Sequence, residues 1–269
     1  MILNNFLHKL NIHIVRNSKW HELHSKIDVE AAKHKWSIRP KLGSCQEFVI
    51  NNLMKFEGKA QLQQDFLALF IQTIQKKKKG FFVEFGAADG VTYSNTFLLE
   101  KSFEWTGIVS EPAKIWHKNL VKNRDCLIDL RCVWSESKKI LQFNQVQEPE
   151  YSTLDAYSHS DHHQNIRNKG KKYSVETVSL EELLSFHNAP RNISYMSIDT
   201  EGSEWSILQA FDFSKYTFDL ITVEHNFTES RILIKNLLNE NGYIRILNEY
   251  SEWDDWYVSK AVKKIMDKI

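Results

Sequence analysis

From about residue 61 onward, short apolar runs alternate with longer amphipathic stretches, and this alternation restricts the fold more than any other feature. The clearest strand is predicted at 81–85, an apolar run with a glycine on each side. Further strands are predicted at 107–110, 127–133, 140–146, 173–178, 193–198, 218–223, 243–247 and 256–259. Strands that alternate with helices predict an α/β fold of Rossmann-like type, with a doubly wound and mostly parallel sheet. Such sheets bind ligands at the carboxyl ends of their strands.

The segment before this region lacks the alternation. Apolar residues at Ile2, Leu3, Phe6, Leu7 and Leu10 form a short helical stripe, and basic and His residues follow it. We predict a helical arm over residues 1–43 that packs on a main domain over residues 44–269. The alternative is that the arm is a membrane-surface helix or a helix that binds a partner.

Composition excludes several classes of protein. The 269 residues are 42% hydrophobic, which is enough for one sizeable domain. A net charge of +1 provides no field that attracts nucleic acid, so we expect no nucleic-acid partner. No apolar run reaches the roughly 20 residues of a transmembrane helix, and the N-terminus is not that of a signal peptide. The three cysteines match no zinc or redox spacing and fit a reducing compartment, so we expect a cytoplasmic location.

A loop of small residues follows the strand at 81–85. Its sequence is Glu84-Phe85-Gly86-Ala87-Ala88-Asp89-Gly90, and small residues allow the backbone to turn sharply and approach a ligand. The loop is neither the GxGxxG dinucleotide fingerprint nor a P-loop. Flanking acids and few backbone donors suit a cationic ligand without phosphate, such as a sulfonium amino acid.

An acidic residue ends the next strand. A carboxylate at the position of Glu111 can accept hydrogen bonds from both hydroxyls of a ribose, as acids do in nucleoside-binding α/β folds. The alternative is a surface glutamate before Pro112 that interacts only with the helix dipole.

Two polar clusters follow the strands at 193–198 and 218–223. The first is Asp199-Thr200-Glu201-Gly202-Ser203-Glu204 and the second is Glu224-His225-Asn226. We expect both to face one crevice, because the two strands should be neighbours in the sheet. Polar groups at buried strand ends are costly unless they are paired, so the alternative is a structural hydrogen-bond network.

Several of these segments, in this order, resemble the FkbM-type methyltransferase family. The similarity is carried by residues 82–90, 94–96, 99–101, 105–112, 197–204 and 222–226, which include Ser94-Asn95-Thr96. It extends from about Ser44 to the segment 253–258 and does not include residues 1–43. Ordered motifs at compatible spacing make the resemblance specific.

The resemblance implies a class I methyltransferase fold with a seven-stranded sheet, S-adenosylmethionine as methyl donor and usually O-methylation of a sugar, glycan or related metabolite. It implies that the methionine side of the cofactor is lined by Glu84, Gly86, Ala87, Asp89 and Gly90. It also implies that Glu111 holds the ribose and that Asn95 and Asp199 bind the cofactor. The segment 129–133 is expected to flank adenine.

Methyl transfer to a hydroxyl requires removal of a proton. We predict His225 as the base, because imidazole titrates near neutral pH, and Asp199 as the second candidate. The alternative for His225 is a structural histidine that braces the strand end. A divalent cation such as Mg²⁺ on Asp199, Glu224 and Asn226 is a further open alternative, and no metal ligand is assigned.

The polar stretch 147–172 is expected to be an acceptor-binding loop. Two other functions are alternatives for the chain: a non-catalytic interaction module on the same fold, and a nicotinamide-dependent oxidoreductase, which the absent GxGxxG disfavours. The sequence makes no prediction of the oligomeric state.

Overall fold

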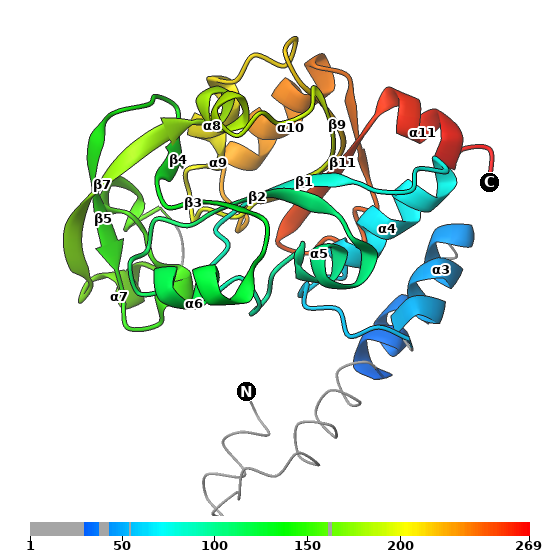
Figure 1. Cartoon of the computed structure of the whole chain (residues 1–269), viewed down its shortest axis with the longest axis horizontal. Helices are drawn as coiled ribbons and strands as arrows, with labels where there is room; N and C mark the ends of the chain where they lie inside the picture. The colour runs from blue at the N-terminus through cyan, green and yellow to red at the C-terminus, as the bar shows by residue number, and fades with distance from the viewer. Residues whose placement is uncertain (1–29, 38–42, 54, 161–162) are drawn as a thin grey trace, which may run out of the picture.

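The computed structural model describes residues 30–37, 43–53, 55–160 and 163–269. Its main feature is a seven-stranded sheet in the order β3-β2-β1-β8-β9-β11-β10 (Figure 1). The strands are β1 (Phe81–Phe85), β2 (Thr106–Ser110), β3 (Leu127–Asp129), β8 (Asn192–Ile198), β9 (Thr217–Glu224), β10 (Tyr243–Ile246) and β11 (Asp254–Ser259). β11 is antiparallel to both its neighbours, and the other pairs are parallel. The predicted doubly wound, mostly parallel sheet is confirmed.

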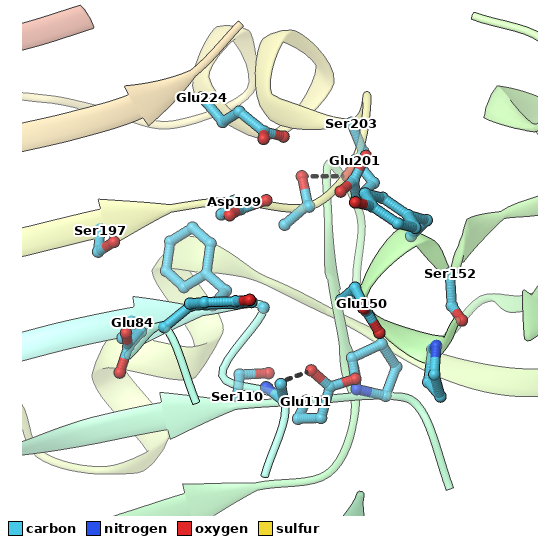
Figure 2. A pocket seen from close by; sticks show the side chains of 18 of the residues that line it. Glu84, Ser110, Glu111, Glu150, Ser152, Ser197, Asp199, Glu201, Ser203 and Glu224 are labelled. Atoms are coloured by element: carbon cyan, nitrogen blue, oxygen red, sulfur yellow. Dashed lines mark hydrogen bonds between the residues drawn. The ribbon is translucent and has the colours of Figure 1, made fainter. Parts of the chain in front are cut away.

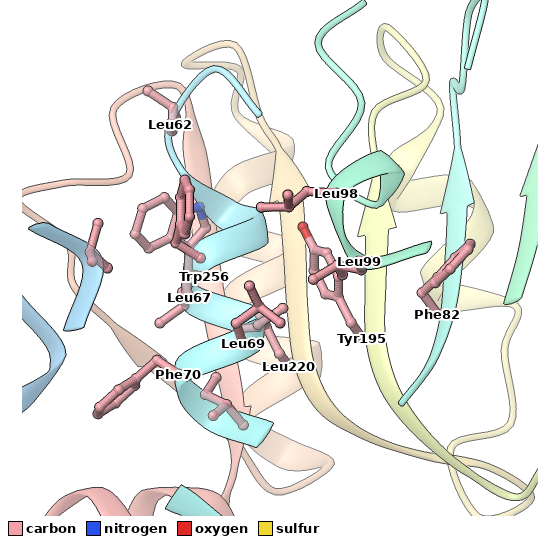
Figure 3. Packing of buried hydrophobic residues seen from close by; sticks show 14 of the residues in the cluster. Leu62, Leu67, Leu69, Phe70, Phe82, Leu98, Leu99, Tyr195, Leu220 and Trp256 are labelled. Atoms are coloured by element: carbon pink, nitrogen blue, oxygen red, sulfur yellow. The ribbon is translucent and has the colours of Figure 1, made fainter. Parts of the chain in front are cut away.

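Helices cover both faces of this sheet, so its strands are buried on both sides. Side chains alternate along each strand: Phe82 packs in the core of one face and Val83 in the core of the other. The first core includes α3 (Ser44–Leu53), α4 (Gln64–Ile74) and α5 (Phe97–Phe103), and α11 (Lys260–Met266) packs beside it (Figure 3). The second core includes α8 (Leu180–Phe186), α9 (Glu204–Gln209) and α10 (Ser230–Glu240).

A second, four-stranded sheet lies at the end of the molecule away from α3 and α11 (Figure 1). Its order is β4 (Cys132–Trp134), β7 (Lys171–Ser179), β5 (Ile140–Gln145) and β6 (Thr153–Leu154). The single strand expected at 127–133 is therefore wrong, because β3 ends at Asp129 and β4 pairs with β7 instead. The Asp129 carboxylate accepts hydrogen bonds from the backbone N–H and the guanidinium of Arg131, which fixes the turn between the two strands.

The described residues that precede position 44 pack on the main domain. Residues 30–37 form a helix in which Trp36 is buried, with its ring centroid 4.5 Å from that of Tyr250. The Trp36 indole donates a hydrogen bond to Gln63 Oε1 at 3.0 Å. The apolar stripe predicted between Ile2 and Leu10 lies outside the described residues. Among the helices in the described ranges, none combines the length and apolar character needed to cross a bilayer.

Candidate active site

A cavity of about 350 Å³ lies at the carboxyl ends of β1, β2, β8 and β9 (Figure 2). The chain runs outward from β1 through β2 to β3 and then returns to β8 on the other side of β1. The strand order therefore reverses between β1 and β8, and α/β sheets bind ligands at such a switch point. This is the site that the strand-end residues were expected to form.

Gly86 is required where the loop after β1 passes the end of β8. Its φ is +82°, and a Cβ at this position would lie 1.7 Å from the carbonyl oxygen of Asp199. Any other residue would have to displace the β8 end or the loop. Gly86 lines the pocket, so the close approach of the two backbones forms its floor.

Three other residues of the glycine loop shape the pocket without lining it, whereas Ala88 lines it. Ala87, Asp89 and Gly90 are not among the residues that line the cavity, although they were expected to contact the cofactor. The Asp89 carboxylate accepts hydrogen bonds from the backbone N–H groups of Val91 and Thr92 and therefore closes the turn. Gly90 has a φ of +81°, and a Cβ there would lie 2.7 Å from the Arg124 side chain.

Glu84 lies at the pocket and is held by a buried network. Its carboxylate accepts hydrogen bonds from the backbone N–H of Asn95 at 2.7 Å and from the Thr96 hydroxyl at 2.6 Å. The guanidinium of Arg124, whose side chain is fully buried, lies 3.3 Å from Glu84 and 2.6 Å from Glu100. Sequence reasoning missed Arg124, because nothing in the sequence after α6 (His117–Asn123) indicates a buried cation.

Asn95 presents an unsatisfied acceptor at the pocket. Its Nδ2 donates to the Ser197 hydroxyl at 2.8 Å, whereas its Oδ1 is buried and has no hydrogen-bond partner in the described part of the chain. A buried acceptor without a donor costs free energy. A ligand with an N–H or O–H group near Asn95 would remove this cost.

Glu111 connects the end of β2 to the loop after β1. Its carboxylate accepts hydrogen bonds from the backbone N–H groups of Ala88 at 2.8 Å and Ala113 at 2.7 Å. Burial raises its pKa to about 7, and these two backbone bonds oppose the shift. Each oxygen retains a second lone pair, so a ligand hydroxyl can still donate to it.

Three carboxyl groups meet at the ends of β8 and β9. Oxygens of Asp199, Glu201 and Glu224 lie within 4.8 Å of one another, and all three line the pocket (Figure 2). Glu201 forms an ion pair of 2.7 Å with the buried Arg167. Glu204 holds the turn that carries Glu201, since its carboxylate accepts from the backbone N–H groups of Thr200 and Gly202.

Asp199 and Glu224 lie beside each other, with carboxyl oxygens within 4.8 Å. Burial raises the pKa of both groups, and the neighbouring Asp199 raises that of Glu224 further. The pair therefore places a carboxylate with an elevated pKa in the pocket.

The structure does not place His225 in the pocket lining. Its ring is buried, Nδ1 accepts a hydrogen bond from the Phe227 N–H at 3.0 Å, and Nε2 lies 3.1 Å from the Asp254 carbonyl oxygen. Because Nδ1 accepts, Nε2 carries the proton, and neither nitrogen has a free lone pair. This geometry corrects the expectation that His225 faces the acceptor and favours the alternative role, a brace for the strand end.

A divalent cation has an incomplete set of candidate ligands here. The carboxyls close enough together are Asp199, Glu201 and Glu224, and Asn226, the other expected ligand, also lines the pocket. Glu201 already binds Arg167. Burial raises the pKa of Asp199 and Glu224, which opposes the deprotonation that metal binding requires. We assign no metal.

The stretch 147–172 supplies one wall of the pocket, as expected for an acceptor loop. Lining residues from it include Glu150, Tyr151 and His163, and the Tyr151 and His163 rings are stacked with centroids 4.3 Å apart. Arg167 in α7 (Gln164–Arg167) donates to the Tyr151 carbonyl oxygen at 2.8 Å. The same arginine binds Glu201, so it joins this wall to the loop after β8.

The segment 129–133 was expected to flank adenine, and this stays a prediction. Cys132 and Val133 line the pocket beside Ser110 and Pro112. Asp129 is not in the lining, because its carboxylate binds Arg131 and approaches His187 at 3.1 Å.

These residues fit S-adenosylmethionine, the cofactor that the sequence resemblance implies. Carboxyl groups suit a cationic sulfonium, and the free Asn95 Oδ1 suits an ammonium donor. The missing Cβ of Gly86 lets the loop after β1 pass the Asp199 carbonyl oxygen, which brings Glu84 and Asp199 to the same pocket.

Comparison with known proteins identifies a methyltransferase family. The model of the methyltransferase FkbM domain family matches residues 84–257. Solved structures that resemble the chain include methyltransferase FkbM from Methylobacillus flagellatus, with 10% identity and a TM-score of 0.41 over 87% of this chain and 59% of that one. A putative S-adenosylmethionine-dependent methyltransferase from Methanococcus maripaludis has 13% identity and a TM-score of 0.36 over 87% and 93%.

Precorrin-6y C5,15-methyltransferase from Geobacter metallireducens has 8% identity and a TM-score of 0.37 over 67% of this chain and 73% of that one. The search of curated proteins gives no match. The assignment rests on the family model, which spans more than half of the chain. The chain therefore belongs to the FkbM family of S-adenosylmethionine-dependent methyltransferases and has their class I α/β fold.

Proposed function

We propose that the chain transfers a methyl group from S-adenosylmethionine to a hydroxyl of a sugar, glycan or related metabolite. The observation that carries this proposal is the Asp199–Glu224 pair, which places a carboxylate with a raised pKa in the pocket. A hydroxyl is a poor nucleophile until a base takes its proton. A base whose pKa lies nearer to neutral pH is suited to this step.

The proposed binding residues follow from their positions in the pocket. Glu84, Gly86 and Asn95 would hold the amino-acid end of the cofactor, and Asp199 lies beside them. Glu111 would accept from the ribose hydroxyls. Ala87, Asp89 and Gly90 would act indirectly, because they shape the loop. The adenine would lie against Cys132 and Val133.

In this mechanism Asp199 removes the acceptor proton. The bound cofactor supplies the methyl group on a cationic sulfur. Asp199 would take the proton of the acceptor hydroxyl, and Glu224 beside it would orient the Asp199 carboxylate. The chain's contribution is to position the reactants, to remove the proton and to keep the pocket partly closed to water.

Aromatic side chains support a polyhydroxylated acceptor. Four aromatic residues line the cavity: Tyr93 between β1 and α5, Tyr151 in the 147–172 wall, Phe227 after β9 and Trp253 before β11. Tyr93 is 56% exposed and Phe227 is 68% exposed, so both offer a ring face to a ligand. Aromatic faces pack against the C–H surfaces of sugars, while the carboxyl groups accept hydrogen bonds from hydroxyls.

The test is methyl transfer with an isotopically labelled cofactor and a panel of sugars, glycosides and hydroxylated metabolites. The expected product is a methyl ether, located by mass spectrometry and NMR. Label found only on nitrogen or carbon, or on no acceptor of the panel, would contradict O-methylation of this substrate class.

A cytoplasmic location remains part of the proposal. Cys45, Cys126 and Cys132 are free thiols, two of them buried. Unpaired cysteines fit a reducing compartment. Fractionation of the native host with thiol labelling would test this.

A further inference from the structure

The charged side chains that line the pocket are acidic. Six carboxyl side chains line the cavity: Glu84, Glu111, Glu150, Asp199, Glu201 and Glu224. Among the described residues that line it, there is no lysine or arginine. His163 is the single lining side chain there that can become cationic near neutral pH, and its ring is stacked on Tyr151.

Arginines behind the wall neutralise only part of this charge. Arg124 pairs with Glu84 and Arg167 pairs with Glu201, and neither arginine lines the cavity. The oxygens of Glu111 accept from backbone N–H groups, and Asp199 has the Glu224 carboxyl group beside it.

Glu150 extends the negative charge to the acceptor side. It is exposed on the 147–172 wall and forms no ion pair with another described residue. Figure 2 shows its side chain directed between Glu111 and Glu201, so an acceptor bound on this wall meets carboxyl groups on several sides. Juxtaposed like charges disfavour binding.

We propose that the acceptor enters this pocket without a phosphate or other anionic group. The inference rests on the proposed function and deepens it, since it excludes sugar phosphates and nucleotide-linked sugars from the substrate class. The substrate is a neutral or amine-bearing sugar, either free or joined in a glycosidic bond. The reaction that supplies it is therefore a glycosyl transfer or a phosphate removal, and methylation follows that step.

Matched acceptors test this inference. For each of several hexoses, the methyl glycoside, the sugar 1-phosphate and the uridine diphosphate sugar are compared at one ionic strength. The expected kcat/KM is at least about tenfold higher for the glycoside, because the phosphates approach the Glu150 carboxylate in a pocket whose lining offers no lysine or arginine among the described residues. The discrimination should shrink as salt screens the charges. Equal or higher kcat/KM for the phosphorylated members would overturn the inference while the proposed function stands.

A charge reversal at the wall sharpens the test. Glu150→Lys should raise the kcat/KM for the sugar 1-phosphate relative to the glycoside by about tenfold. Glu148→Lys is the matched control, because Glu148 is exposed in the same turn but does not line the cavity. An equal shift in both variants would mean that general surface charge governs selectivity, and the inference would fail.

A binding measurement separates this inference from the proposed function. Inorganic pyrophosphate and uridine diphosphate are titrated into protein saturated with S-adenosylhomocysteine, and the heat of binding is measured. We expect no binding at millimolar concentration. If the panel yields no methylated hydroxyl, the proposed function fails, and these titrations alone decide the inference: binding of either anion overturns it, and its absence sustains it.

Discussion

Glu84 and Asp199 are carboxyl groups at neighbouring strands of the same sheet, yet they have opposite surroundings. Glu84 on β1 faces a buried arginine, two hydroxyls and a backbone N–H. Asp199 after β8 faces another carboxyl group, Glu224, and no cation among the described residues. The first arrangement fixes a loop, whereas burial raises the pKa of Asp199 in the second. The two carboxyl groups therefore differ in their partners, and this difference is the reason that we propose Asp199, and not Glu84, as the base.

The largest expected effect, a loss of turnover, comes from replacing Asp199. Asp199→Asn should lower kcat by about 10²–10⁴-fold, because a positioned base contributes that much. The affinity for S-adenosylhomocysteine and the melting temperature should change little. Turnover near that of the wild type in the folded variant would remove Asp199 from the mechanism.

Removing the arginine that pairs with Glu84 should instead lower the stability of the fold. Arg124→Met leaves Glu84 and Glu100 buried without their cation, which costs about 3–5 kcal/mol in the free energy of unfolding. Urea denaturation measures the loss. The double variant with Glu84→Leu is the control, and we expect its loss to be smaller than the sum of the two single losses. Additive losses would show that the two residues do not act as a pair.

A moderate effect is expected for the carboxyl at the ribose position. Glu111→Gln should weaken binding of S-adenosylhomocysteine by roughly 10–100-fold, since a hydrogen bond to a charged group contributes about 1.5–3 kcal/mol. Calorimetric titration measures the change. Unchanged affinity would mean that Glu111 serves only to join β2 to the glycine loop.

The smallest of these effects concerns His225. His225→Ala should lower the free energy of unfolding by about 1–3 kcal/mol, because the Phe227 N–H and the Asp254 carbonyl lose their partner. Turnover of the protein that remains folded should stay near that of the wild type. A fall of two or more orders of magnitude in kcat without loss of stability would restore the base role first predicted for this residue.

The sheet was predictable because its strands are continuous apolar runs that end in polar residues. The cluster around Asp199 and Glu224 followed from the same logic, since adjacent parallel strands bring their carboxyl ends together. The split of the segment 127–133 was not predictable in this way. It depends on the bonds between Asp129 and Arg131, which turn the chain into a second sheet.

Partners that lie far apart in the sequence account for the rest. Arg124 and Arg167 follow polar stretches and look solvent-exposed in the sequence, yet both side chains are buried against glutamates. His225 was placed at the right strand end, but the sequence does not show that the Asp254 carbonyl takes its Nε2 hydrogen bond. Residue type and position predicted the site, whereas the roles within it depended on these contacts.

The most direct test of the central claim is the pH dependence of methyl transfer at saturating cofactor and acceptor. Asp199 must be ionised to accept a proton, and burial raises its pKa above the usual carboxyl range. Below that raised pKa the base is protonated, so kcat should fall about tenfold for each pH unit and should level off above it. The Asp199→Asn variant should lack this limb. A wild-type kcat that stays constant from neutral pH down to the ordinary carboxyl range would contradict Asp199 as the base.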